Sequence, residues 1–181
     1  MKKIIQLCGI LAVVLLCSFA PGAWVAYESK AGGYKVSMPG KAQENSQAVE
    51  TAVGTLTMNM AMLQSDDNDV KMFMSVYSDY PDSILNGNLS KDDLEEFFNS
   101  TIAGAARNVG GTTVKKEVIS YKNYPGRHAV INIEDKGATF EMNVFLVRNR
   151  IYILQVGYMT GAKNLAAVKQ FYSSFQLTAA K

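Results

Sequence analysis

The sequence predicts an α+β domain in which a central antiparallel sheet has helices packed on it. Apolar and polar residues alternate along most of the chain, as over 54–64, and a period of two is typical of strands. Two segments, 90–109 and 162–175, instead carry apolar residues at helical spacing. Short turns join the expected strands, which excludes a parallel nucleotide-binding sheet because parallel strands need long crossovers.

The first strands are bounded by glycine, proline and polar turns. Gly32-Gly33 precedes the first strand, Pro39-Gly40 ends it, and the acidic residues 65–69 form a later turn. We expect strands or hairpin arms at 34–38, 47–64 (a hairpin about Val53-Gly54) and 70–77.

The first helix has clear start and stop signals. Ser90 is the expected N-cap, Asp93 follows three residues later, and Gly110-Gly111 ends the helix. Acidic side chains in the first turns favour the positive end of the helix dipole. Its apolar stripe consists of Leu94, Phe97, Phe98, Ile102 and Ala105.

A second run of strands follows this helix. We expect them at 112–121, 127–134, 139–147 and 151–158, with turns at Tyr124-Pro125-Gly126, Lys136-Gly137 and Arg148-Asn149-Arg150. The last helix is expected from about 162 to 175, burying Leu165, Val168, Tyr172 and Phe175.

The N-terminus has the three-part layout of a secretory signal peptide. Lys2 and Lys3 precede an apolar run over 4–16, and small or turn-forming residues follow. The run is shorter than the roughly 20 apolar residues of a spanning helix. We predict a signal peptide over 1–22 with cleavage before Ala23. Cleavage after Ala20 and an uncleaved anchor are the alternatives, and lipidation of Cys17 or Cys8 fits poorly because a leucine precedes each cysteine.

The rest of the chain, 23–181, is the size of one domain and needs no disulfide to bury a core. Both cysteines lie within 1–22. The whole chain has a net charge of +2, and without Lys2 and Lys3 the net charge of 23–181 is zero. A neutral domain does not favour nucleic-acid binding. We therefore expect a periplasmic or secreted protein that meets a membrane only through its signal peptide, unless that segment is uncleaved.

Several short motifs occur between and within these elements in a recognisable order: Met38-Pro39-Gly40, the strand and acidic loop over 76–82, Tyr124-Pro125-Gly126, and residues 148–154 and 171–177. This order resembles the PsbP-like and DcrB-like families of exported proteins over most of residues 27–178. The resemblance implies an α/β/α sandwich with a central antiparallel sheet, and a generally non-enzymatic accessory role. Many DcrB-like members are lipoproteins, and this chain differs from them because its cysteines fit lipidation poorly. No functional motif of photosynthetic PsbP is matched, so oxygen-evolving chemistry is not implied.

The hairpin about Lys136-Gly137 carries the candidate binding residues. A period of two places its polar side chains on one face, opposite Ile131, Ile133, Phe140, Met142 and Val144. The functional interpretation is a recognition surface, and the ordinary one is the solvated side of a half-buried sheet. The candidate residues are His128, Asn132, Glu134, Glu141 and Asn143.

Catalytic and metal sites have weaker support. His128 is the only histidine and no G-x-S-x-G elbow is present, so we predict no catalytic residue and no cofactor. Residues 66–69 lack the spacing of a calcium loop, and one histidine excludes an ordinary zinc site. We therefore predict no metal site, with one alternative for the methionines.

Five methionines lie on two consecutive strands: Met58, Met60, Met62, Met72 and Met74. Core filling is the first interpretation because methionine is a flexible apolar side chain. Thioethers also bind monovalent copper. The leading hypothesis is a non-enzymatic accessory or binding protein that recognises an envelope protein or component. The alternatives are a carrier of a small apolar ligand or copper, and a hydrolase that depends on His128.

Overall fold

The computed structural model describes residues 23–51, 54–67, 69–85, 89–163 and 165–178. The described elements, in chain order, are β1 (Val25–Ser29), β2 (Tyr34–Met38), β3 (Gln43–Thr51), β4 (Gly54–Gln64), β5 (Val70–Asp79), α1 (Lys91–Val109), β6 (Thr112–Tyr121), β7 (Tyr124–Ile133), a 3₁₀ turn (Glu134–Lys136), β8 (Ala138–Val147), β9 (Arg150–Met159), α2 (Ala166–Ser173) and β10 (Gln176–Leu177).

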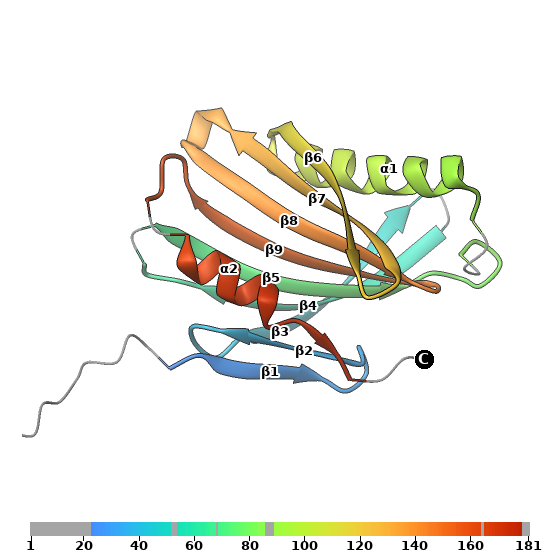
Figure 1. Ribbon diagram of the computed structural model, residues 1–181, viewed down its shortest axis with the longest axis horizontal. Coiled ribbons are helices and arrows are strands. Elements are labelled where there is room, and N and C mark those ends of the chain that lie inside the picture. Colours follow the sequence, from blue (N-terminus) through green and yellow to red (C-terminus); the bar gives the residue numbers. More distant parts are fainter. Residues whose placement is uncertain (1–22, 52–53, 68, 86–88, 164, 179–181) are drawn as a thin grey trace, which may run out of the picture.

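The strands form two antiparallel sheets. The large sheet has seven strands in the order β3-β4-β5-β9-β8-β7-β6, and the small sheet has the order β1-β2-β10. The large sheet is strongly curved, with α2 and the small sheet in front of it and α1 behind β6 and β7 (Figure 1). We call the side that carries α2 and the small sheet the front face, and the side that carries α1 the back face.

Each face of the large sheet has its own apolar core. On the front face, Tyr34, Val36 and Met38 of β2 and Phe171 of α2 are buried against β5, β8 and β9. On the back face, three residues of α1, Phe98, Ile102 and Ala106, are buried against β7, β8 and β9. Burial of one such large apolar side chain contributes about 2 kcal/mol, so apolar burial stabilises the packing of the small sheet, α2 and α1 on the large sheet.

Helix α1 begins and ends as its sequence predicts. The Oγ atom of Ser90 accepts a hydrogen bond from the backbone N–H of Asp93 at 3.1 Å, and Gly110 has φ 68°, the left-handed conformation of a glycine cap. An ion pair between Arg127 and Glu95 attaches the exposed side of the helix to β7. The Arg127 guanidinium also lies 4.9 Å from the ring centroid of Phe98 and lowers the pKa of Glu95.

The prediction of an α+β fold with helices packed on a central antiparallel sheet, an α/β/α sandwich, is wrong, because the fold is mostly β. Strands make up 55% of the described residues, and a second sheet takes much of the front face. We did not predict β1 as a strand, yet β2 pairs with it and with β10. The last helix is also shorter than predicted, since it begins at Ala166 and has eight residues. The second sheet forms because β2 packs its apolar side chains onto the large sheet, which leaves its two edges free to pair with β1 and β10.

A buried arginine fastens the small sheet to the large one. The Arg150 side chain donates to both carboxylate oxygens of Asp79, at 2.5 and 2.6 Å, and to the carbonyl oxygens of Ala31 and Gly32, at 2.9 and 2.8 Å. The hydroxyl of Tyr152 donates to the Gly32 carbonyl at 2.7 Å. The turn between β1 and β2 is therefore held by side chains of β9.

The predicted signal peptide, 1–22, lies outside the described residues, and so do both cysteines. Of the helices in the described part of the chain, none combines the length and the apolar character that a membrane crossing requires.

Candidate functional site

The candidate residues of the β7–β8 hairpin come together mainly on the front face. His128 pairs with Asn143, Val130 with Glu141, and Asn132 with Thr139, so these residues share the face that the alternation predicts. Glu134 lies apart from them, because it begins the exposed 3₁₀ turn after β7. We call His128, Val130, Asn132, Thr139, Glu141 and Asn143 the polar face; each of these side chains except Thr139 is half-buried.

Hydrogen bonds hold the polar face in one arrangement. The Nδ1 atom of His128 lies 2.8 Å from the Asn143 side-chain oxygen, so Nδ1 carries the proton and donates it. Thr139 Oγ1 donates to the Asn132 side-chain oxygen at a long 3.4 Å and lies 3.1 Å from the Thr160 hydroxyl. The Asn143 amide therefore fixes the orientation of the His128 ring.

Glu141 connects the polar face to α2. Its carboxylate accepts a hydrogen bond from the Tyr158 hydroxyl at 3.0 Å, and its backbone carbonyl accepts one from the Tyr172 hydroxyl at 2.8 Å. Burial, together with the negative charge of Glu141, raises the pKa of Tyr158 to about 12. Burial also raises the pKa of Tyr172. Both phenols therefore stay protonated at neutral pH and act as fixed hydrogen-bond donors.

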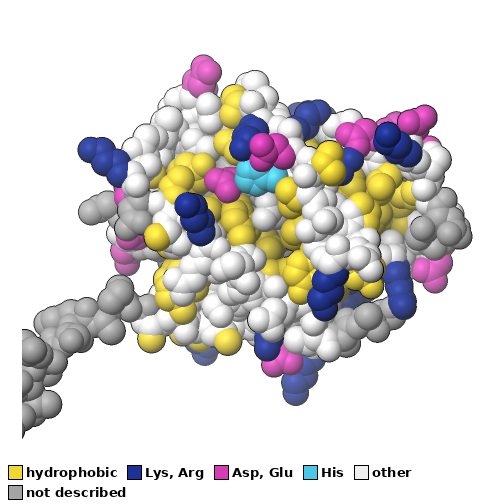
Figure 2. Space-filling model, in the orientation of Figure 1, with side chains coloured by type: hydrophobic (Ala, Val, Ile, Leu, Met, Phe, Trp, Pro, Cys, Tyr) yellow, Lys and Arg dark blue, Asp and Glu magenta, His cyan; other side chains and the backbone are white. Residues whose placement is uncertain are grey.

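The structure adds residues that the hairpin alone did not reveal. Glu117 of β6 is the cross-strand partner of His128 on the side away from Asn143. Tyr158 and Tyr172 come from β9 and α2. The predicted turn at Tyr124-Pro125-Gly126 is wrong, since these residues begin β7 and the turn lies at Lys122-Asn123. The cross-strand position of Glu117 follows from this observed turn, and no local signal identifies the tyrosines. In Figure 2 the histidine lies at the surface with acidic and basic side chains beside it.

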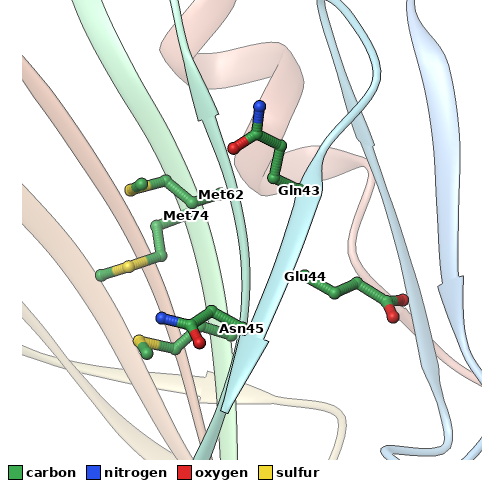
Figure 3. Close-up of a pocket in the computed structure, with 6 residues that line it drawn as sticks. Gln43, Glu44, Asn45, Met62 and Met74 are labelled. Atoms are coloured by element: carbon green, nitrogen blue, oxygen red, sulfur yellow. The ribbon is translucent and has the colours of Figure 1, made fainter. Parts of the chain in front are cut away.

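The back face carries a second candidate, a pocket at the β3 edge of the large sheet. Its volume is about 240 Å³ and it is lined by Gln43, Glu44, Asn45, Met60, Met62 and Met74. Met62 and Met74 point to the same side of the sheet as Asn45, whereas the Glu44 carboxylate points the other way (Figure 3). The methionines thus lie beside neutral amides rather than beside a carboxylate.

The pocket bears on the two carrier alternatives. Small-molecule sites typically have volumes of roughly 300–1,000 Å³, so this pocket suits a small occupant better than a large apolar ligand. Carriage of an apolar ligand stays a prediction. Sequence reasoning missed Gln43 and Asn45, because the predicted hairpin began at Gln47 and the observed β3 begins at Gln43.

Two further features bear on metal binding. In the described ranges, His, Cys, Asp and Glu side chains do not form any group of three or more that is placed to hold a metal ion. The Asp67 carboxylate instead accepts the backbone N–H groups of Asp69 and Val70, at 2.8 and 3.0 Å, which lowers its pKa. This acidic segment therefore has the geometry of a polar turn.

Comparison of the fold with solved structures gives one informative likeness. The solution structure of cyanobacterial PsbP (CyanoP) from Synechocystis sp. PCC 6803 has a TM-score of 0.53 and 14% sequence identity, over 88% of this chain and 95% of that chain. The fold is PsbP-like. No protein-family model matches the sequence, and no curated protein matches it either.

The likeness confirms one part of the predicted resemblance. The PsbP-like part is confirmed at the level of the fold, whereas the DcrB-like part stays a prediction. At 14% identity the likeness concerns the fold alone.

Proposed function

We propose that this chain is a non-catalytic accessory protein of the cell envelope that binds an envelope protein or component through the polar face. The observation that carries the proposal is the organisation of that face. His128 is bonded to Asn143, and Glu141 is bonded to Tyr158, before any partner arrives. Ordered polar groups lose little side-chain entropy on binding, so such a surface favours recognition.

Three further features support this proposal. The N-terminal layout of Lys2, Lys3 and the apolar run over 4–16 favours export. The fold is similar to that of an accessory protein, cyanobacterial PsbP. The DcrB-like part of the resemblance also implies exported accessory proteins. Together they favour a periplasmic or secreted location for 23–181, with binding rather than chemistry as its task.

The test is capture of the partner from an envelope fraction by tagged protein, followed by identification of what co-purifies. We expect the change of His128, Asn132 and Glu141 together to alanine to abolish capture, since it removes the bonded groups at the centre of the polar face. The matched control changes Glu96 and Arg107, exposed on α1, to alanine and should capture the partner normally. Equal capture by both variants would rule out the polar face.

A single variant, His128→Ala, tests the hydrolase alternative. His128 is the only histidine, so a conventional serine-hydrolase mechanism in this chain depends on it. We expect the wild type and His128→Ala to show equal activity against ester and peptide substrates. A loss of activity confined to His128→Ala would instead favour an enzyme.

A further inference from the structure

The pocket on the back face brings together methionines from two neighbouring strands. Met62 of β4 is the direct cross-strand partner of Met74 of β5, and Met60 lies two residues from Met62 on the same face. Directly paired residues have Cβ atoms about 5 Å apart, and diagonal neighbours about 7–8 Å. The long methionine side chains reach across these separations, so three thioether sulfurs can meet above one point of the sheet.

These methionines differ from the core methionines of the same chain. Met38 and Met142 are 0% and 1% exposed, as expected for side chains that fill a core. Met60, Met62 and Met74 are only partly buried and line a pocket. Met60 and Met74 also pack against the edge of the back-face core, but core filling alone does not account for three flexible thioethers placed together beside an opening.

The surroundings of the three methionines are polar but uncharged. Gln43 pairs with Met62 and Asn45 with Met60 on the outer side, on the edge strand β3. On the inner side, Gln155 of β9 pairs with Met74 and is buried. Across the sheet this row reads Gln43, Met62, Met74 and Gln155, so an amide lies on each side of the two thioethers. An apolar ligand that covered these amides would bury them without hydrogen bonds.

We propose that Met60, Met62 and Met74 form a binding site for a monovalent soft cation, Cu(I). Thioethers are soft neutral ligands that select Cu(I) over divalent metals. The three methionines line an open pocket of about 240 Å³, so an ion can reach them from solvent. The site lies on the opposite sheet face from the polar face, so this proposal and the proposed function stand or fall separately.

The experiment is an anaerobic titration of the purified chain with Cu(I) against a chromophoric Cu(I) chelator. Cys8 and Cys17 are first changed to serine, because thiolates also bind Cu(I). We expect one Cu(I) per chain, with an affinity that is constant between pH 6 and 8, since thioethers do not titrate. Zn(II) should not compete, because it prefers nitrogen, oxygen and thiolate ligands.

Leucine variants identify the ligands. Leucine and methionine have similar volumes, so the change of Met60, Met62 and Met74 to leucine should preserve the fold, which far-UV circular dichroism checks. We expect the Cu(I) affinity to fall at least tenfold, because even outer-shell substitutions cost about 10–100-fold. Met159→Leu, at a methionine that is 39% exposed on β9, is the matched control and should bind as the wild type does.

Two results would overturn the proposal. The first is a wild-type affinity that the triple leucine variant retains, and the second is the absence of stoichiometric Cu(I) binding by the wild type. X-ray absorption by the Cu(I)-loaded wild type gives an independent answer that needs no variant to fold. Sulfur atoms bound directly to copper support the site, and nitrogen atoms in their place would assign the metal to His128 instead.

Discussion

Arg150 shows how one side chain can join two sheets. Its guanidinium is planar and carries five N–H donors. The Nε and Nη2 atoms donate to the Asp79 carboxylate, and Nη1 donates to the backbone carbonyls of Ala31 and Gly32. The Arg150 side chain is 6% exposed and that of Asp79 is 45% exposed, so the pair lies at the edge of the core. A lysine at this position cannot satisfy the same four acceptors.

We predict that Arg150→Lys lowers the free energy of unfolding by about 2 kcal/mol, because hydrogen bonds to charged groups contribute roughly 1.5–3 kcal/mol each and several are lost. Urea unfolding measures the change. Arg148→Lys is the control, since Arg148 is exposed in the preceding turn, and it should change stability by less than about 0.5 kcal/mol. Equal effects at the two positions would contradict the fastening role.

Tyr158 gives a prediction about alkaline pH. Burial and Glu141 raise its pKa to about 12 in the folded chain, above the value of about 10 expected when the chain is unfolded. The stability that this protonated phenol contributes is fully present below pH 10 and is lost as the pH rises from 10 to 12. The free energy of unfolding should therefore fall less steeply between pH 9 and 11.5 in Tyr158→Phe than in the wild type. Parallel pH profiles would contradict this assignment.

At the scale of elements, α1 is the part of the chain with the strongest local signals. Ser90 both accepts the Asp93 N–H and donates to the Asp93 carboxylate at 2.6 Å. The start, the end and part of the buried stripe of α1 were therefore predictable from sequence, because capping and helical spacing act within a few residues. Ala106 is buried in place of the predicted Ala105. The last helix lacks a capping side chain at its first turn, and its predicted start was four residues too early.

We predict that Ser90→Ala lowers the free energy of unfolding by about 1 kcal/mol, the typical effect of removing an N-cap side chain. Thermal and urea unfolding provide the measurement. Ser100→Ala, at an exposed position within the same helix, is the control and should be neutral or slightly stabilising, because alanine has the higher helix propensity. If the two variants lose the same stability, the cap does not hold the start of α1.

The strands of the large sheet were predicted with similar success. Alternation located β4 to β9 approximately and predicted that His128 and Asn143 share a face, whereas their direct pairing comes from the structure. The exceptions are instructive. Most side chains of β1 and almost all of those of β3 are exposed, so neither strand shows a strong apolar pattern. Such strands form because a neighbour offers them hydrogen bonds.

At the scale of the whole molecule, the two sheets share one core. Tyr34 of the small sheet packs against Tyr152 of β9 and donates or accepts a hydrogen bond at Ser75 of β5, at 2.9 Å. Trp24, the only tryptophan, packs edge-on against Phe73 with ring centroids 6.0 Å apart. Because these contacts cross between the sheets, separate unfolding of the small sheet would expose the core of the large one.

We predict that the small and large sheets unfold in one transition. Trp24 fluorescence reports on the small sheet and far-UV circular dichroism reports mainly on the large one, so the two urea transitions should coincide. Arg150→Lys should move both midpoints together. A fluorescence transition at lower urea than the dichroism transition would show that the small sheet opens independently.

The sequence by itself determined the element types, the pairing within hairpins and the candidate residues of the polar face, because these depend on contacts between residues close in the chain. Only the tertiary structure decided the layers. It placed β1 and β10 on the edges of β2, brought Tyr158 and Tyr172 to Glu141, and opened the thioether pocket between β3, β4 and β5. These arrangements join segments that are distant in sequence. Local patterns do not distinguish between the possible strand pairings, and the favourable free energy of burying the apolar faces decides which pairing forms.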